Sequence, residues 1–299
     1  MNADAIIRAS RLRAFVSLCK VRVNSLIVFT AMVGMLLAQA GFPSPKTFLA
    51  ASAGIGLMAF AAAAINCLIE RTTDARMART RGRPLPRGEI APAEALSMAM
   101  VLGGTGLFLL HAWVNDLTLW LTLATFLGYA VIYTVVLKPA TPMNIVIGGA
   151  AGAMPPLLGW VAMTGHITQQ AVALFLIIFL WTPPHFWALC MARREDYAKA
   201  GFPMLPLTHG IRYTCAQSLI YVALLSAASF LPVLLGMAGI AYAAVAVILD
   251  AVFLVRVFRL WRSYSDAASW NVFRYSIVYL GGLFAAMFAD RLVAPWLPV

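Results

Sequence analysis

Long stretches without a single charged side chain limit what this chain can fold into. Four of them are about the length of one membrane crossing, and two others are long enough for two crossings each. A helix needs about 20 apolar residues to cross the hydrocarbon core of a bilayer. The sequence therefore predicts a polytopic membrane protein. The six charge-free stretches are Val23–Pro45, Thr47–Ile69, Ala95–Asn115, Leu117–Leu137, Pro139–Ala192 and Tyr213–Leu249.

Short breaks divide the two longest stretches. "TGHITQQ" (Thr164–Gln170) splits the first of them, and "GMAG" (Gly236–Gly239) splits the second. The eighth helix then continues to about Arg256, and a ninth covers roughly Asn271–Ala289. We expect residues 1–299 to form one domain, an all-α bundle of nine transmembrane helices. The composition agrees, because 62% of the residues are hydrophobic and only 11% are charged, against about 25% charged in soluble domains.

Basic residues predict the orientation of the bundle. If the N-terminus is cytoplasmic and nine helices alternate, only Lys46 and Arg291 of the 22 basic residues face outward. Lys and Arg concentrate in cytoplasmic loops, so we expect the C-terminus to be periplasmic, in a bacterial inner membrane. The formal net charge of +11 is then mostly a topology signal, and no nucleic-acid partner is expected.

The stretch "NCLIERTTDARMARTRGRPLP" gathers acids and arginines at the inner end of the second apolar stretch. Asn66, Glu70 and Asp74 follow one another at steps of four residues and would share one helix face. Oxygen ligands of this kind suit Mg²⁺, which often keeps phosphate oxygens as further ligands. Guanidinium groups would hold the other side of a diphosphate. The alternative is a solvated face whose acids form salt bridges with the arginines. The arginines are Arg71, Arg76, Arg79, Arg81 and Arg83.

A second inner loop, "CMARREDYAKAGFPMLPLTHG", has a similar layout. Asp196 is a candidate for the remaining metal ligand, beside Arg193, Arg194 and Lys199. The alternative is a basic cytoplasmic loop with incidental acids. Both loops finish in a proline-rich segment that cannot continue a helix. We expect the two loops to cap one cavity that opens to the cytoplasm.

Other polar residues at the inner helix ends have two interpretations, as topology markers or as contacts to a leaving diphosphate. Lys138 follows the fourth apolar stretch, with Tyr133 before it and Asn144 at the start of the next helix. Lys20 and Arg22 in "LCKVRVN" stand just before the first apolar stretch.

His185, in "WTPPHFWAL", lies inside the predicted sixth helix. An imidazole in a membrane span is costly and is therefore a functional candidate by default. Three interpretations are open for this imidazole. It would ligate a haem iron, form a hydrogen bond with a polar substrate, or form one with a helix neighbour near Pro183 and Pro184. Asp250, inside the eighth helix, is a further polar candidate whose partner the sequence does not reveal.

The four cysteines all fall near inner helix ends, and none forms a CxxC motif. We expect free thiols there, because the cytoplasm is reducing. They are Cys19, Cys67, Cys190 and Cys215.

These motifs resemble those of the intramembrane UbiA-type prenyltransferases. "NCLIERTTDARMARTRGRPLP" is similar to the first aspartate-rich motif of that family. "RTRGRPLP", "YTVVLKPATPMNIVIGGAAGAMPPLLGW" and "LWTPPHFWALCMARREDYAKAGFPMLP" are similar to its protohaem IX farnesyltransferase (haem O synthase) branch. The resemblance spans about Lys20 to Pro206. Three residues depart from the wider pattern, which has acids at their positions: Glu70 replaces an aspartate, and Thr72 and Arg193 replace acids outright. The number of Mg²⁺ ions therefore stays open.

The resemblance implies farnesyl diphosphate and haem b as substrates, Mg²⁺ as cofactor and haem O as product, for use in haem–copper terminal oxidases. A haem A synthase or an oxidase assembly factor would receive that product. The implied metal ligands are Asn66, Glu70, Asp74 and Asp196, and the implied catalytic residues are Glu70, Asp74, Asp196 and Lys138. The implied substrate-binding residues are Lys20, Arg22, Arg79, Arg83, Tyr133, Asn144, His185, Arg194 and Lys199.

Two other functions remain open at this point. One is prenyl transfer to a quinone precursor, because a motif of the form NxxxDxxxD does not by itself separate the two kinds of enzyme. The other is transport. Transporters place their polar residues near the middle of the membrane, whereas the carboxylates here cluster at its inner edge, so transport is disfavoured.

Overall fold

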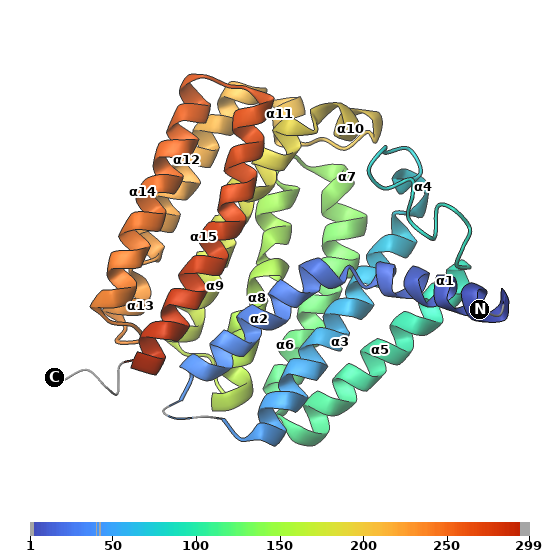
Figure 1. Ribbon diagram of the computed structural model, residues 1–299, viewed down its shortest axis with the longest axis horizontal. Helices are drawn as coiled ribbons and strands as arrows, with labels where there is room; N and C mark the ends of the chain where they lie inside the picture. Colours follow the sequence, from blue (N-terminus) through green and yellow to red (C-terminus); the bar gives the residue numbers. More distant parts are fainter. Residues whose placement is uncertain (1–2, 40, 42, 294–299) are drawn as a thin grey trace.

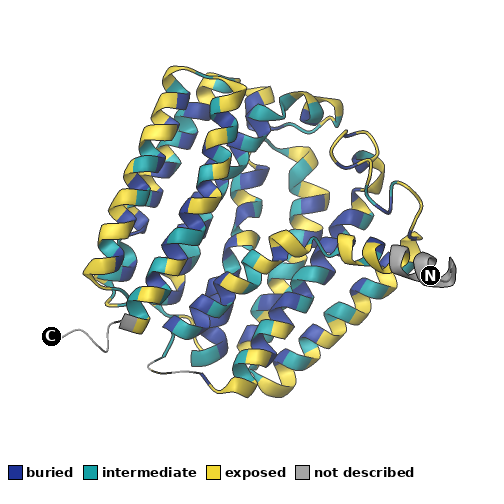
Figure 2. Cartoon of the chain, viewed as in Figure 1, coloured by how far each residue is buried: buried dark blue, intermediate teal, exposed yellow. Residues whose placement is uncertain are grey.

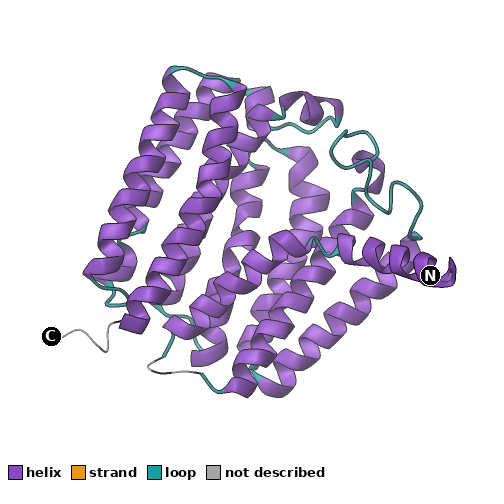
Figure 3. Cartoon of the chain, viewed as in Figure 1, coloured by secondary structure: helices purple, strands orange, loops and turns teal. Residues whose placement is uncertain are grey.

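The computed structural model describes residues 3–39, 41 and 43–293. Every regular element among these residues is helical, and the long helices run side by side as one bundle (Figures 1 and 3). The all-α class predicted from the sequence is confirmed. In chain order the elements are α1 (Ala3–Leu18), α2 (Val21–Leu37), α3 (Pro45–Ile69), α4 (Arg71–Asp74), α5 (Pro92–Trp113), α6 (Asp116–Leu127), the π-helix η1 (Gly128–Leu137), α7 (Lys138–Ala140), α8 (Asn144–Thr164), α9 (Gln169–Ala192), α10 (Arg194–Lys199), α11 (Leu205–Thr208), α12 (Ile211–Ala228), α13 (Leu231–Leu234), α14 (Ile240–Arg262) and α15 (Asp266–Val293).

Eight helical segments of the described chain are long and apolar enough to cross a membrane. A ninth is counted when the bent pair Arg11–Leu18 and Val21–Leu37, which meet at 48°, is taken as one span. The nine expected crossings therefore each have a helical counterpart. The first is shorter than expected, because α2 ends at Leu37 and not at Pro45. The glycine and prolines of "GFPSP" that follow do not continue a helix.

Two later segments extend beyond their expected ends. Helix α14 continues to Arg262, because cationic side chains are favourable in the last turn of a helix. Helix α15 begins at Asp266, earlier than the expected Asn271, and reaches Val293. The two expected breaks in the longest apolar stretches are confirmed, between α8 and α9 and between α13 and α14.

Burial follows the pattern of a membrane bundle, with buried residues between the helices and exposed residues on their outer sides (Figure 2). Trp187, Phe253 and Tyr279 are fully enclosed. On the outside, Val101 is 67% exposed and Ile248 is 63% exposed. Isolated apolar residues on the surface of a soluble protein are ordinary, but here they cover the middle of long helices, where lipid would meet them.

Helices α2 and α8 pack backbone against backbone. A Cβ added at Gly159 would lie 2.0 Å from the Ala31 carbonyl oxygen, and one at Gly34 would lie 2.2 Å from that of Pro156. Small residues of this kind allow close approach of membrane helices. The contact fixes the position of α2 and, with it, the start of α2 next to the candidate site.

Asp250 has its partners inside the bundle. Ser229 donates a hydrogen bond to Oδ2 and Tyr279 donates one to Oδ1, each at 2.7 Å. The carboxyl group is 5% exposed and joins α14 to α15 and to the end of α12. Its role is therefore the structural one of a satisfied buried polar group.

The connections alternate between the two ends of the bundle. In Figure 1 the α3–α5, α9–α12 and α14–α15 connections lie at the upper end, and the C-terminal end of α15 lies at the lower end. Both loops singled out in the sequence are therefore at the same end of the molecule.

All four cysteines are free, as expected.

Candidate functional site

A row of three polar side chains at the end of α3 meets a row of three cations, and we refer to these six residues as the polar ladder. Lys20 donates to Asn66 Oδ1 at 2.6 Å, and Arg83 donates to Asp74 Oδ2 at 2.5 Å. Lys138 forms an ion pair with Glu70 between them. The three polar residues are at most 9% exposed. The ladder members are Lys20–Asn66, Lys138–Glu70 and Arg83–Asp74.

The backbone at the end of α3 keeps the four-residue spacing even though the helix itself stops. Helix α3 ends at Ile69, Glu70 leaves the helical conformation (φ −83°, ψ 2°) and the short α4 follows. The Glu70 N–H still donates to the Asn66 carbonyl at 3.0 Å, and the Asp74 N–H to that of Glu70 at 2.7 Å. The continuous helix face expected from the sequence is thus broken, but its three side chains remain neighbours.

The π-helix η1 supplies the neighbouring wall. Thr134 Oγ1 donates to the Tyr129 carbonyl at 2.8 Å and accepts from Asn66 Nδ2 at 3.1 Å. Lys138 follows four residues later and reaches Glu70, which is four residues after Asn66. Contacting residues on α3 and η1 are thus offset by the same 68 positions in both pairs. π-helical segments are rare and are frequent at functional sites.

Lys20 owes its direction to an unusual backbone. It is the one non-glycine residue with positive φ in the described chain (φ 46°, ψ 48°) and forms the elbow between α1 and α2. Asn24 fixes this elbow by donating to the Cys19 carbonyl at 2.7 Å and to that of Ala59 at 3.3 Å. A left-handed conformation costs on the order of 1–3 kcal/mol for a residue other than glycine. That cost is associated here with aiming an ammonium group at Asn66.

The two inner loops touch each other beside the ladder. Met77 of the first loop packs with Tyr197 and Met204 of the second, against Cys190 of α9. Burial raises the pKa of the Tyr197 phenol, Cys190 raises it further and the charge of Arg79 lowers it. The two loops thus contact each other, and the cavity that we expect them to cap stays a prediction.

Several expected site residues point elsewhere. Arg194 donates to Asp266 Oδ1 at 2.7 Å and to the Tyr264 hydroxyl at 3.2 Å. Arg22 and Lys199 are exposed and have no side-chain partner in the described chain. Asp196 pairs with Arg193 at 3.5 Å, within its own loop. The geometry therefore centres the candidate site on the first loop, Lys20 and Lys138.

Tyr133 and Asn144 lie near the ladder without joining it. The Tyr133 ring stacks on that of Tyr129, with centroids 5.7 Å apart, and covers Gly148 so closely that an added Cβ would lie 2.1 Å from the ring. Asn144 is fully buried, and its amide donates to the Thr141 carbonyl at 2.5 Å. Its side-chain oxygen Oδ1 has no hydrogen-bond partner in the described chain. A buried acceptor left unpaired costs about 1–3 kcal/mol, which favours a bound group as its partner.

His185 is held on three sides within the bundle. Trp181 and Phe273 stack on its ring, with centroids 4.2 Å and 4.7 Å away. Nδ1 lies 2.6 Å from Ser276 Oγ, and the Trp181 indole donates to the Ser276 carbonyl at 2.7 Å.

The proton positions around His185 follow from Ser276. Its hydroxyl donates to the Phe273 carbonyl at 2.7 Å, and that carbonyl can only accept. A hydroxyl has one proton, so His185 Nδ1 must carry the hydrogen of the other bond. Nε2 then keeps a lone pair, and it has no hydrogen-bond partner in the described chain. It is free to bind iron or to accept a hydrogen bond.

The donor set suits a hard cation in its chemistry. Asn66, Glu70 and Asp74 offer only oxygen, which Mg²⁺ prefers. Among the residues that the structure describes, no three His, Cys, Asp or Glu side chains are grouped so as to hold a metal ion. The carboxylates are instead each paired with a cation of the ladder. The ladder thus brings oxygen ligands for a cation and basic groups for a phosphate together in one place.

Sequence reasoning missed Thr134 and Ser276. Thr134 stands four residues before Lys138, the same spacing that separates Asn66 from Glu70, and this shared spacing was the available signal. Ser276 lies 91 residues from His185, and nothing in the sequence connects the two.

Comparisons with known proteins agree with this geometry. The model of the UbiA prenyltransferase family matches residues 27–286. A protein of Dechloromonas aromatica named protoheme IX farnesyltransferase is 62% identical over 283 residues, which cover 95% of each chain. A protein of the same name from Thiobacillus denitrificans is also 62% identical, with the same coverage.

Solved structures show the same fold. A digeranylgeranylglyceryl phosphate synthase structure has a TM-score of 0.80 at 21% identity, and covers 94% of this chain and 99% of its own. A UbiA homologue from Archaeoglobus fulgidus, bound to DMAPP and Mg²⁺, has a TM-score of 0.65 at 16% identity, with 92% and 97% covered. The family match over most of the chain, supported by the near-full-length relatives, decides between a transporter and an enzyme: this chain is a member of the UbiA prenyltransferase family.

Proposed function

We propose that this enzyme transfers the farnesyl group of farnesyl diphosphate to a vinyl group of haem b, with addition of water, giving haem O. The observation that carries the proposal is the 62% identity over 95% of the chain to proteins named protoheme IX farnesyltransferase. The family match over residues 27–286 and a hydrophobic core with members from Val33 to Met287 support residues 1–299 acting as one domain.

The polar ladder is the place for the diphosphate. Asn66, Glu70 and Asp74 would hold Mg²⁺. Asp196 would become a further ligand from the second loop only by leaving Arg193, its partner in this structure. When bound, the metal supplies positive charge that neutralises the diphosphate and stabilises it as a leaving group. A UbiA homologue structure with Mg²⁺ and a prenyl diphosphate supports this dependence.

The cations of the ladder stabilise the charge that develops on the leaving group. Lys138, at the start of α7, reaches Glu70, and Lys20, at the elbow, reaches Asn66. Arg83 and Arg79 approach from the first loop. Burial alone lowers the pKa of Arg83, but the charge of Asp74 raises it above its ordinary value. The three ladder cations, together with Arg79, would bind phosphate oxygens as the C1–O bond breaks.

The remaining contacts concern the apolar parts of the substrates. The bond electrons of C1–O leave with diphosphate, and the π electrons of the haem vinyl group form the new bond to C1. Water then adds to the carbon left positive and loses one proton, so the product gains a farnesyl and a hydroxyl group. We assign Tyr133 and Asn144 to the substrate end near C1, and the unpaired Asn144 Oδ1 supports this by being available to a bound polar group.

His185 is our candidate for the haem contact. Its Nε2 carries the lone pair, and its ring is clamped by Trp181 and Phe273. Imidazole is a common axial ligand of haem. We assign His185 to binding and orienting haem b.

Membrane placement completes the proposal. The several apolar helices and the family show an integral membrane protein. We propose the bacterial inner membrane, with the loop end of the bundle in the cytoplasm, where diphosphate is soluble. Haem and the farnesyl chain dissolve in the bilayer, so haem O would pass within the membrane to a haem A synthase or an oxidase assembly factor.

The test is a product assay with the purified full chain in lipid nanodiscs, given haem b, farnesyl diphosphate and Mg²⁺. We expect a product heavier than haem b by one farnesyl and one hydroxyl group, with release of diphosphate. Omitting Mg²⁺ should abolish it. A product formed from 4-hydroxybenzoate and none from haem would reject the proposal in favour of a quinone-precursor enzyme.

A further inference from the structure

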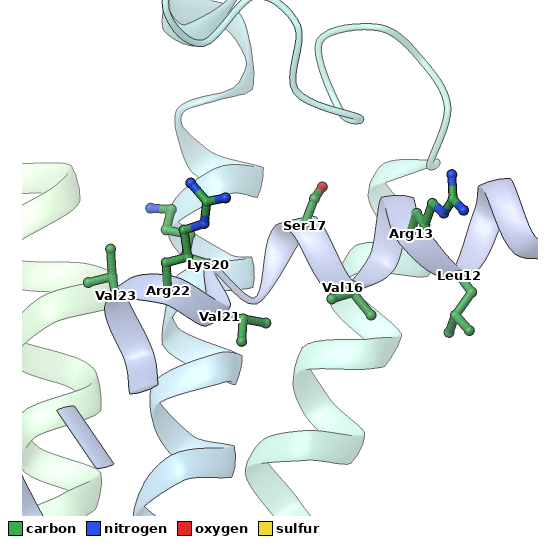
Figure 4. A pocket seen from close by; sticks show the side chains of 8 residues that line it. All are labelled: Leu12, Arg13, Val16, Ser17, Lys20, Val21, Arg22 and Val23. Carbon is green, nitrogen blue, oxygen red and sulfur yellow. The ribbon is translucent and has the colours of Figure 1, made fainter. Parts of the chain in front are cut away.

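The elbow between α1 and α2 forms a hollow of about 550 Å³. Its apolar lining includes Leu12, Val16 and Val21, which are 65%, 47% and 45% exposed. Figure 4 shows Leu12, Val16 and Val21 pointing to one side of the elbow, while Arg13, Lys20 and Arg22 point to the other. This is the amphipathic arrangement of a helix that lies in the plane of a membrane surface.

The three basic residues of the hollow differ in whether their side chains have a hydrogen-bond or ion-pair partner. Lys20 is bound to Asn66. Arg13 and Arg22 are exposed and have no ion-pair or hydrogen-bond partner for their side chains in the described chain. Arg11, which directly precedes Leu12, is paired with Glu94 of α5 and so ties α1 to the bundle. Two free guanidinium groups therefore stand at the rim of an apolar hollow.

We propose that this hollow binds an anionic phospholipid of the cytoplasmic leaflet. Its phosphate would contact Arg13 and Arg22, and an acyl chain would cover Leu12, Val16 and Val21. The head group matches the two arginines, because one guanidinium group can bind two phosphate oxygens at once. The acyl chain matches the apolar lining, because exposed apolar side chains at the interface are covered by acyl chains.

The geometry favours a structural lipid over the prenyl substrate at this place. Among the described residues, neither Arg13 nor Arg22 contacts the acidic members of the ladder, whereas Lys20 donates to the ladder residue Asn66. The lipid would brace the strained elbow at Lys20 from the membrane side.

The experiment measures lipid retention by native mass spectrometry of the full chain in detergent, titrated with phosphatidylglycerol or phosphatidylcholine of the same chains. The wild type should retain phosphatidylglycerol preferentially. Arg13→Gln should reduce that preference about fivefold, since a basic residue contributes about that factor at an anionic surface. Arg13→Lys should keep most of it. Leu12→Asn should weaken the retention of both lipids.

The matched control is Arg259→Gln, which removes an exposed arginine from the last turn of α14. It should leave the preference unchanged. An equal loss in Arg259→Gln would show general charge attraction and overturn the site. Displacement of phosphatidylglycerol by micromolar farnesyl diphosphate would also overturn it, because the hollow would then be a substrate site. Neither result bears on the product assay above.

Discussion

The basic side chains around Asn66, Glu70 and Asp74 have different freedom to respond to a phosphorylated substrate. Lys20 is bound to a neutral amide, so moving its ammonium group to a phosphate leaves no unpaired carboxylate behind. Lys138 and Arg83 are paired with buried carboxylates. Leaving such a partner uncompensated costs about 3–5 kcal/mol. Those two cations will engage phosphate only when another cation takes over their acids, which couples metal binding to substrate binding.

Asp74→Asn tests this coupling at the level of one charge. The substitution keeps the size of the side chain but removes the negative charge that holds Arg83 and would hold Mg²⁺. We expect turnover to fall on the order of 100-fold or more, while haem b still binds with its normal absorbance. Initial rates across a Mg²⁺ titration give the measurement.

The control for Asp74 is Asp266→Asn, at the same end of the bundle. Asp266 forms an ion pair with Arg194 but is 54% exposed, and exposed pairs contribute little. It should leave turnover within about twofold. Near-normal activity of Asp74→Asn at saturating Mg²⁺ would make Asp74 a structural partner of Arg83 and nothing more.

His185 and Ser276 form a second pair whose roles can be separated. His185→Ala should shift the haem absorbance and weaken haem affinity by at least about tenfold, with farnesyl diphosphate binding little changed. Ser276→Ala removes the acceptor that fixes the Nδ1–H tautomer. Loss of such an outer partner costs about 10–100-fold in metal affinity.

Ser276→Thr keeps the hydroxyl and should restore the wild-type haem spectrum, which a merely space-filling role for Ser276 would not require. If His185→Ala binds haem with unchanged affinity and spectrum, the imidazole is a satisfied core residue clamped between two aromatic rings.

At the scale of the helix, the close approach of α2 and α8 positions the elbow that carries Lys20. Gly159→Ala would place a methyl group 2.0 Å from the Ala31 carbonyl oxygen, and backbone atoms cannot move aside as a flexible side chain can. We expect a loss of about 1–3 kcal/mol in stability and a lower melting temperature in detergent.

Gly152→Ala is the matched control on the same helix. Nothing lies within 4 Å of the Cβ it would add, and alanine favours a helix over glycine by about 1 kcal/mol. Its melting temperature should stay the same or rise. Equal melting temperatures for the two variants would mean that α2 and α8 do not pack as described.

Element existence was predictable here, and local helix geometry was not. Charge-free runs predicted eight of the nine crossings because the bilayer sets their length, and the ninth was placed in an apolar stretch that contains Arg274. The π-helical path of η1 leaves no such trace, since its residues are as apolar as those of an ordinary span. As a result Lys138 was identified as a candidate, while its neighbour Thr134 was missed. Arg22 and Arg194 were selected with the true neighbours of the ladder, because residue type alone does not separate a phosphate contact from a topology marker.

At the scale of the whole molecule, the expected nine crossings would place the two chain ends on opposite sides of the membrane. The basic loops between α3 and α5 and between α9 and α12 share one end of the bundle with the site, and α15 runs to the other end (Figure 1). The order of the helices therefore brings the two basic loops, which are far apart in the sequence, to the same end of the bundle. The charge asymmetry of the sequence predicts the same arrangement.

Reporter fusions test that topology. A reporter fused after Val299 should read as periplasmic, and one inserted after Gly201, in the loop between α10 and α11, should read as cytoplasmic. Alkaline phosphatase and green fluorescent protein at each site give opposite signals. A cytoplasmic signal at Val299 would remove one crossing and reverse the placement of every later loop.

The polar ladder also bears on how such a protein is made. Its members carry two negative and three positive charges, and each carboxylate already has a cation of the same chain beside it. Insertion and helix association therefore need no help from an outside ion to avoid burying bare charge. We therefore expect the nascent chain to complete its assembly in a cell starved of iron or of isoprenoids, so that the amount of protein in the membrane does not depend on its substrates.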